Sequence, residues 1–119
     1  MHYSECDYSI IIPVYGTTDI LKILYKRINK TFQKISENYE LIFIDDCGPS
    51  NSWKTINEIA SFDSRVRAFK LSRNFGQHNA ILCGIREANG NLLITMDDDL
   101  QHPPEEIPKL ISELKKGFD

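Results

Sequence analysis

Short apolar segments alternate with longer segments of helical periodicity along the whole chain, and this alternation restricts the fold more than any other feature. The apolar segments, which predict strands, are Tyr8 to Val14, Tyr39 to Ile44, Arg65 to Leu71 and Leu92 to Met96. Strands that are apolar almost throughout and are separated by helices are typical of a parallel sheet with both faces covered. We therefore expect an α/β fold with three layers, α/β/α, around a mainly parallel sheet, and we expect the fourth strand to be buried.

Between and after these strands, apolar residues recur at intervals near 3.6, which predicts amphipathic helices. The predicted helices cover about 17–36, 51–62, 78–88 and the residues from Pro104 onward. Proline is well tolerated at the first position of a helix, so Pro104 marks the start of the fourth. We expect Ser50 or Asn51 to cap the second helix and Asn89-Gly90 to close the third.

The size and charge of the chain limit its class. With 119 residues the chain suits one domain, residues 1–119. A net charge of −3 and a pI of about 5.6 provide no basic surface, so no nucleic-acid partner is expected. No apolar run approaches the ~20 residues that span a bilayer, and the polar start with Glu5 and Asp7 is unlike a signal peptide. A cytoplasmic location is therefore the expectation. Three cysteines without C-x-x-C spacing are typical of reduced thiols.

Unusual polar side chains fall at the carboxyl ends of all four predicted strands. They are Tyr15, the pair Asp45-Asp46, Arg73 and the run Asp97 to Asp99. In open α/β sheets, ligands bind beyond the carboxyl ends of the strands. Four strands that each end in potential ligand groups are stronger evidence for a binding site than any one of these motifs.

Three adjacent carboxylates, Asp97-Asp98-Asp99, follow the fourth predicted strand. Adjacent anions repel one another unless a cation neutralises them. Because alternate residues of an extended segment point the same way, Asp97 and Asp99 are placed to face one ion. Oxygen ligands without His or Cys favour a hard cation such as Mg2+ or Mn2+, which keeps positions open for substrate phosphates. The alternative is a solvated acidic turn, but the apolar strand before the run and the Pro pair after it favour an ion site.

The other strand ends carry groups suited to a nucleotide. Pro13 lacks an N–H and suits a strand end, which leaves Tyr15 free to stack on a base or sugar, or else to pack against the next loop. One carboxylate of Asp45-Asp46 is suited to a nucleobase imide or a ribose hydroxyl, and the other to capping the following turn. Arg73 is suited to a base or a diphosphate, and we expect Phe75 to anchor its loop.

Together, four stretches of the chain resemble the N-terminal, nucleotide-binding half of family 2 glycosyltransferases with the GT-A fold. Among these, the chain is most similar to the transferases that use dolichol phosphate or undecaprenyl phosphate. The stretches are Ser9-Ile-Ile-Ile-Pro-Val-Tyr15, Leu41-Ile-Phe-Ile-Asp-Asp46, Leu71-Ser-Arg-Asn-Phe-Gly-Gln77 and Met96-Asp-Asp-Asp-Leu-Gln-His-Pro-Pro-Glu105. The last two, in this spacing, are the most specific.

The resemblance implies roles for individual residues. The nucleotide-binding residues that it implies are Pro13, Tyr15, Asp45, Asp46, Arg73, Asp97 and Asp98. The acidic run stands at the family's D-x-D position, where Asp97, Asp99 and Gln101 would hold Mn2+ or Mg2+ with the donor diphosphate. The resemblance also implies inverting transfer of a sugar from a UDP- or GDP-sugar to a polyprenyl phosphate or a glycan.

The chain departs from the family in two places. Gly16-Thr17-Thr18 stands where the family often has Asn-Glu-Glu, so a carboxylate that helps to hold the nucleoside is missing. The family also continues well past the position of Asp119. We therefore expect a truncated GT-A fold whose acceptor half and catalytic base lie beyond Asp119, with membrane association in a longer form. An unfinished sheet edge could also pair in a homodimer. The alternative function is a non-catalytic nucleotide-binding or regulatory module.

Overall fold

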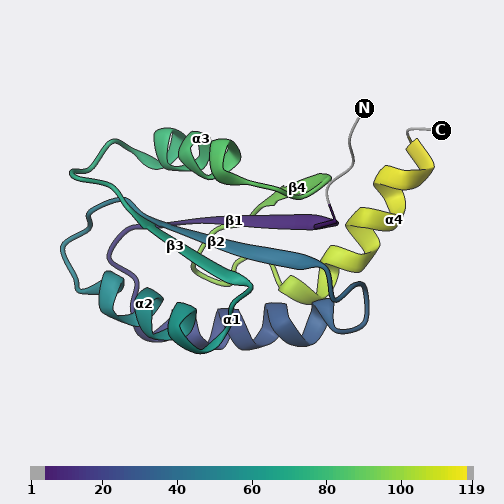
Figure 1. Ribbon diagram of the computed structural model, residues 1–119, viewed down its shortest axis with the longest axis horizontal. Coiled ribbons are helices and arrows are strands. Elements are labelled where there is room, and N and C mark those ends of the chain that lie inside the picture. The colour runs from purple at the N-terminus through teal and green to yellow at the C-terminus, as the bar shows by residue number, and fades with distance from the viewer. Residues whose placement is uncertain (1–4, 118–119) are drawn as a thin grey trace.

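Four parallel strands form the centre of the fold in the computed structural model of the chain, which describes residues 5–117 (Figure 1). The strands are β1 (Tyr8–Val14), β2 (Tyr39–Asp45), β3 (Val66–Lys70) and β4 (Leu92–Thr95). Their order in the sheet is β3-β2-β1-β4, and each neighbouring pair is parallel. The predicted βαβ alternation and parallel sheet are confirmed.

Helices cover both faces of this sheet. The helices are α1 (Asp19–Phe32), α2 (Ser52–Phe62), α3 (Gln77–Glu87), the short 3-10 helix η1 (Pro104–Glu106) and α4 (Ile107–Gly117). Figure 1 shows α1 and α2 on one face of the sheet and α3 on the other, so the three-layer α/β/α prediction is confirmed. No helix among residues 5–117 is both long enough and apolar enough to cross a membrane.

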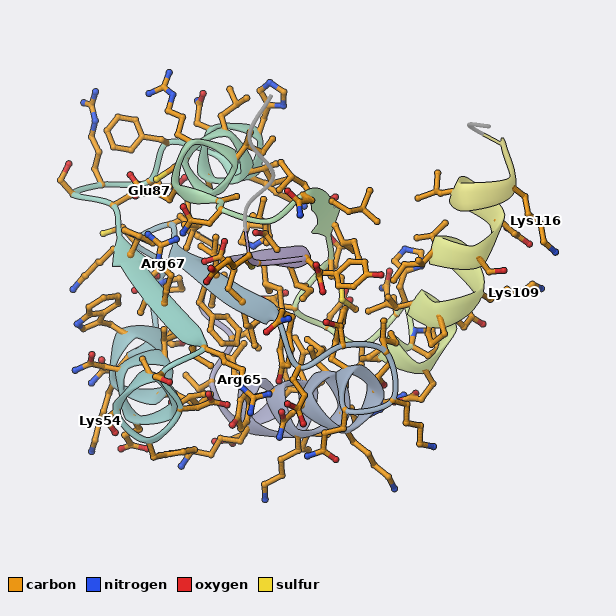
Figure 2. All side chains as sticks on the ribbon, turned by 45° about the vertical axis from the view of Figure 1, so that its right-hand side comes forward. Lys54, Arg65, Arg67, Glu87, Lys109 and Lys116 are labelled. Carbon is orange, nitrogen blue, oxygen red and sulfur yellow. The ribbon has the colours of Figure 1, made fainter. Side chains whose placement is uncertain are left out.

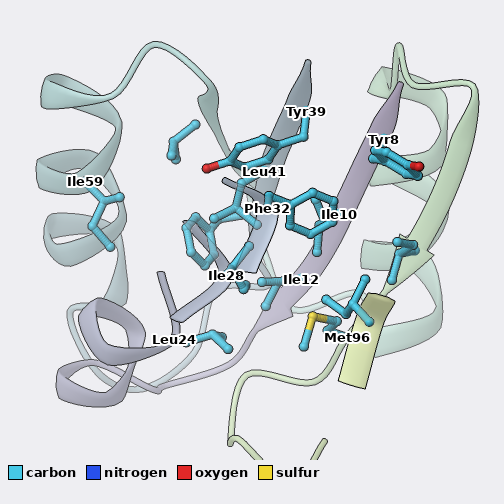
Figure 3. Packing of buried hydrophobic residues seen from close by; sticks show 14 of the residues in the cluster. Tyr8, Ile10, Ile12, Leu24, Ile28, Phe32, Tyr39, Leu41, Ile59 and Met96 are labelled. Carbon is cyan, nitrogen blue, oxygen red and sulfur yellow. The ribbon is translucent and has the colours of Figure 1, made fainter. Parts of the chain in front are cut away.

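The two central strands carry the core, because every residue of β1 and β2 is buried. Successive side chains of a strand point to opposite faces, so Ile10 and Ile12 pack with α1 and α2, whereas Ile11 packs with α3. Figure 3 shows the larger of the two clusters, in which Phe32 of α1 lies beside Tyr39 and Leu41 of β2. Burial on both faces explains why these strands are apolar almost throughout.

The structure corrects the prediction for the fourth strand. This strand ends at Thr95, and it is only partly buried, since Leu93 is 40% exposed. The reason is its position: within the described residues β4 pairs with β1 alone and forms one edge of the sheet. β3 forms the other edge of the described sheet and is likewise only partly buried. A homodimer that pairs through an open edge stays a prediction.

Helix ends agree with the sequence in part. Asn51 caps α2 by accepting a hydrogen bond from the Lys54 N–H at 3.4 Å, and Pro104 begins η1. The predicted Asn89-Gly90 closure of α3 was wrong, because α3 ends at Glu87 and the next residue, Ala88, is already extended. Gly90 is instead required by close packing: a Cβ there would lie 2.5 Å from the Ser9 nitrogen.

The strand order also locates the switch point of the sheet. From β1 the chain proceeds outward to β2 and β3, and then crosses to place β4 on the other side of β1. In doubly wound sheets, ligands bind in the crevice at this reversal, outside the carboxyl ends of the strands. The carboxyl ends of β1 and β4 are therefore where the fold itself predicts a ligand.

Candidate functional site

Every loop that follows a strand contains a residue with positive φ. These residues are Gly16 at 81°, Cys47 at 56°, Gly76 at 93° and Leu100 at 63°. Positive φ is unfavourable for Cys and Leu, and such conformations gather at ligand sites, where surrounding contacts hold them. At the carboxyl edge of the sheet, the backbone therefore adopts a positive-φ conformation after each of the four described strands.

One cavity of about 440 Å³ opens at this edge. It is lined by Pro13, Val14, Tyr15, Asp46, Asn74, Gly76, Gln77, Asp97, Asp98 and Asp99. Six of the predicted site residues therefore meet in one place: Pro13, Tyr15, Asp46, Asp97, Asp98 and Asp99. Within the described chain, Asp45, Arg73 and Gln101 do not line this cavity. Its size falls within the range of small-molecule sites.

The end of β1 forms one wall of the cavity. The Ile11 carbonyl accepts a hydrogen bond from the Met96 N–H at 3.0 Å, so the backbone polar groups of Ile11 face β4. The backbone of Pro13, two residues further along β1, faces the same side but lies past the end of β4. The missing N–H of Pro13 therefore costs no ladder bond there. The next side chain but one, Tyr15, is 56% exposed and is free to contact a ligand.

Asp45, the last residue of β2, and Asp46, the residue after it, have separate surroundings, although both are buried. Asp45 accepts a hydrogen bond from the Cys47 N–H at 3.2 Å and so caps the turn after the strand. Burial raises the pKa of Asp45 above its ordinary value, although amide hydrogen bonds from the turn oppose this. Asp46 instead faces the cavity, and its Oδ1 accepts a hydrogen bond from the Phe75 N–H at 2.9 Å.

The loop between β3 and α3 is held differently from the prediction. Phe75 does anchor it, but through its main-chain N–H, since its ring is 40% exposed. The Arg73 guanidinium lies over that ring, 4.7 Å from its centroid. Inside the loop, the Asn74 side chain accepts from the Gly76 N–H at 2.8 Å.

Three residues of this loop and of the first turn of α3 line the cavity, although the sequence predicted no ligand contact for them. They are Asn74, Gly76 and Gln77. The available signal was their place directly after a strand, in the stretch Leu71 to Gln77.

The acidic run after β4 is a turn and not an extended segment. Asp98 and Asp99 form the turn, and the Gln101 N–H donates to Asp99 Oδ1 at 3.1 Å. Asp97 Oδ1 accepts from Gln77 Nε2 at 3.1 Å. The extended geometry from which we placed Asp97 and Asp99 side by side is therefore wrong, yet all three carboxylates still line the same cavity.

The donor set at this turn fits a hard cation that is bound together with a ligand. Residues 5–117 hold no group of three or more His, Cys, Asp or Glu side chains arranged to enclose a metal ion. Mg2+ is commonly held by one or two carboxylates together with substrate phosphates. A cavity lined by Asp97, Asp98 and Asp99 offers oxygen ligands of that kind.

Replacing Asp46 by Ala is expected to loosen the loop at 72–76. A hydrogen bond to a charged group contributes about 1.5–3 kcal/mol, so the Phe75 amide should exchange its hydrogen roughly tenfold faster or more. Hydrogen exchange followed by NMR measures this, with the Phe43 amide in β2 as the internal control. Equal acceleration at Phe43 would show global destabilisation instead of a local anchor.

Comparison with known proteins gives a consistent result. A protein-family model described as "Glycosyl transferase family 2" matches residues 9–119. The undecaprenyl-phosphate 4-deoxy-4-formamido-L-arabinose transferase of Proteus mirabilis is 45% identical over 112 residues, which cover 93% of this chain and 34% of that protein. The protein of the same name from Pseudomonas fluorescens is 44% identical over 112 residues, which cover 93% of this chain and 33% of that protein. The chain thus spans about a third of the length of these relatives.

Solved structures share the fold. The mannosyltransferase PcManGT from Pyrobaculum calidifontis, in complex with GDP-Man and Mn2+, superposes with a TM-score of 0.77 at 15% identity, over 99% of this chain and 33% of that one. S. aureus TarS 1-349 in complex with UDP-GlcNAc gives a TM-score of 0.67 at 19% identity, over 93% and 31%. The predicted GT-A fold is confirmed, and the match over residues 9–119 shows that the chain belongs to glycosyl transferase family 2.

Proposed function

We propose that this chain is the nucleotide-sugar-binding part of an inverting, metal-dependent glycosyltransferase. The donor is a UDP- or GDP-sugar, and the acceptor is a polyprenyl phosphate or a glycan. The observation that carries the proposal is the cavity at the β1–β4 switch point, where Asp97, Asp98 and Asp99 face Asp46 and the exposed Tyr15. The undecaprenyl-phosphate in the relatives' names supports the lipid acceptor, and the nucleotide sugars in the similar structures support the donor.

In this proposal the two sides of the cavity bind different parts of the donor. Tyr15 stacks on the base or ribose, and Asp46 accepts a hydrogen bond from one of them, because its carboxylate lines the cavity. Arg73 reaches the nucleotide from the loop between β3 and α3, where its side chain is exposed. Asp45 contributes through the turn that it caps.

On the other side, Asp97, Asp98 and Asp99 form an acidic wall of the cavity. In this proposal, Asp97 and Asp99 hold Mn2+ or Mg2+ together with the donor diphosphate. When bound, the cation offsets negative charge on the departing nucleoside diphosphate. Gln101 supports the turn by donating its N–H to Asp99. A role for the Gln101 side chain as a metal ligand stays a prediction.

The reaction in this proposal is a direct displacement, which the resemblance to inverting family 2 glycosyltransferases supports. An acceptor oxygen forms a bond to the anomeric carbon while the bond from that carbon to the diphosphate oxygen breaks, which inverts the configuration. A catalytic base takes the proton of a hydroxyl acceptor, and we assign no residue of this chain to that role. A cytoplasmic location and membrane association of a longer form remain part of the proposal.

The location of the donor is tested by NMR titration of the 119-residue chain with UDP or GDP in the presence of Mg2+. We expect the backbone amides of Tyr15, Asn74, Gly76 and Asp98 to shift with one of the two nucleotides. Shifts confined to the opposite end of the sheet, around Ser9 and Gly90, would contradict the site.

Nucleotide binding alone does not separate an enzyme from a non-catalytic nucleotide-binding module. Release of UDP or GDP from the matching nucleotide sugar, dependent on Mn2+ and stopped by a chelator, supports the transferase. Binding of the nucleotide sugar that needs no Mn2+ and is not followed by such release would favour the module.

A further inference from the structure

We infer that Gln77 is a positioning residue that fixes the Asp97 carboxylate for cation and diphosphate binding. The inference rests on the proposed function, since it concerns how that acidic wall is held. Neither the predicted ligands nor the predicted nucleotide contacts included Gln77.

The contact itself joins the start of α3 to the loop after β4, two segments that are distant in sequence. Gln77 is the first residue of α3, and its Nε2 donates to Asp97 Oδ1 at 3.1 Å. Gln77 and Asp97 line the 440 Å³ cavity and also a neighbouring one of about 620 Å³ between β4 and α4. The pair therefore stands at the partition between the two cavities.

The Gln77 side chain starts from a fixed backbone. Two residues earlier, the Phe75 N–H is held by buried Asp46, and the Ala80 N–H donates to the Gly76 carbonyl at 3.0 Å to begin the helix. Residues 75–77 thus connect the carboxylate after β2 with the carboxylate after β4, across the end of β1. Because the backbone of residues 75–77 is held in this way, the Gln77 side chain starts from a fixed position relative to Asp97.

A neutral amide is the suitable partner for a carboxylate that must also bind a cation. Its N–H occupies Oδ1 and restricts rotation of the carboxylate, which leaves Oδ2 for the ion. Lysine in this place would neutralise the charge on Asp97, and a glutamate would repel it. Outer contacts that orient metal ligands typically contribute 10–100-fold to metal affinity.

The test compares Mn2+ binding by the whole chain and by Gln77→Met, which keeps the length of the side chain and removes the donor. Electron paramagnetic resonance measures free Mn2+ during titration in the presence of UDP or GDP. We expect about tenfold weaker Mn2+ binding in the variant. Gln33→Met, at an exposed position just after α1, is the matched control and should not differ from wild type.

A double-mutant cycle separates positioning from a general structural effect. If Gln77 acts through Asp97, Gln77→Met should add no further loss in an Asp97→Asn background. Equal Mn2+ affinity in wild type and Gln77→Met, or a tenfold loss that persists in the Asp97→Asn background, would overturn the inference while leaving the proposed function intact. Absence of Mn2+ binding by the wild-type chain would overturn the proposed function, and the inference with it.

Discussion

Replacing Glu40 by Ala is expected to lower the free energy of unfolding by about 3 kcal/mol, because buried donors lose their acceptor. Typical domains are stable by only 5–15 kcal/mol, so this is a large fraction of the total. Glu40 is 6% exposed and lies in β2. Its carboxylate accepts from the Ser9 hydroxyl at 2.6 Å and from the Asn89 N–H at 2.6 Å. The Ser9 oxygen in turn accepts from the Gly90 N–H at 2.7 Å.

Arg67 completes this network from β3. Its guanidinium donates to Glu40 Oε1 at 3.0 Å and lies 3.5 Å from the Glu87 carboxylate at the end of α3. Figure 2 shows Arg67 and Glu87 on the same side of the molecule, where β3 and α3 approach one another. A single carboxylate thus joins β1, β2, β3 and the turn before β4, at the end of the sheet opposite the cavity.

Urea unfolding measures the loss, and Glu37→Ala, three residues earlier at an exposed position, is the control that removes the same charge. Glu40→Gln should fall between the two, since its amide oxygen still accepts one hydrogen bond. A loss at Glu40→Ala no greater than that of Glu37→Ala would contradict a structural role for the network.

The same carboxylate gives the stability a dependence on pH. Burial alone would raise the pKa of Glu40, but hydrogen bonds from Ser9, Asn89 and Arg67 outweigh it and bring the pKa below its ordinary value of 4.5. A pKa depressed in the folded state contributes stability above the unfolded pKa, and that contribution is lost as pH falls through the folded value. Wild type should therefore lose stability below pH 4.5 more steeply than Glu40→Ala.

The alternation of apolar strands and amphipathic helices was sufficient to predict the fold. Parallel strands buried on both faces have few alternatives, so β1 and β2 were correctly placed from their apolar residues alone. The fourth strand was harder, because its burial depends on its position at the edge of the described sheet, which local sequence does not encode. The same limit applied to Gly90, where the constraint is the approach of Ser9 from another strand.

The candidate site was predicted for a topological reason. Parallel strands bring their carboxyl ends to one edge, so Tyr15, Asp46 and Asp97 could be grouped without knowing any distance. What could not be predicted were contacts between loops. The Phe75 N–H on Asp46 and the Gln77 amide on Asp97 depend on how the β3–α3 loop passes over β1. The extended geometry assumed for the acidic run failed because β4 ends before it.

Removal of one carboxylate from the acidic turn should have the largest effect on ligand binding. Asp97→Ala and Asp99→Ala are each expected to weaken Mn2+-dependent nucleotide binding by at least about 100-fold, since even outer contacts to metal ligands contribute 10–100-fold. The fold should survive, because Asp97 is only partly buried and Asp99 is exposed. Glu37→Ala again controls for the loss of one negative charge.

The central claim is that the turn at Asp97 to Asp99 holds a divalent cation together with a nucleoside diphosphate. Calorimetric titration of UDP and of GDP, each with and without Mn2+, tests it most directly on wild type, Asp97→Ala, Asp99→Ala and Glu37→Ala. We predict that one nucleotide binds wild type and Glu37→Ala only with Mn2+, and that both aspartate variants lose this binding. Nucleotide binding that is independent of Mn2+ and unchanged in Asp97→Ala and Asp99→Ala would contradict the claim.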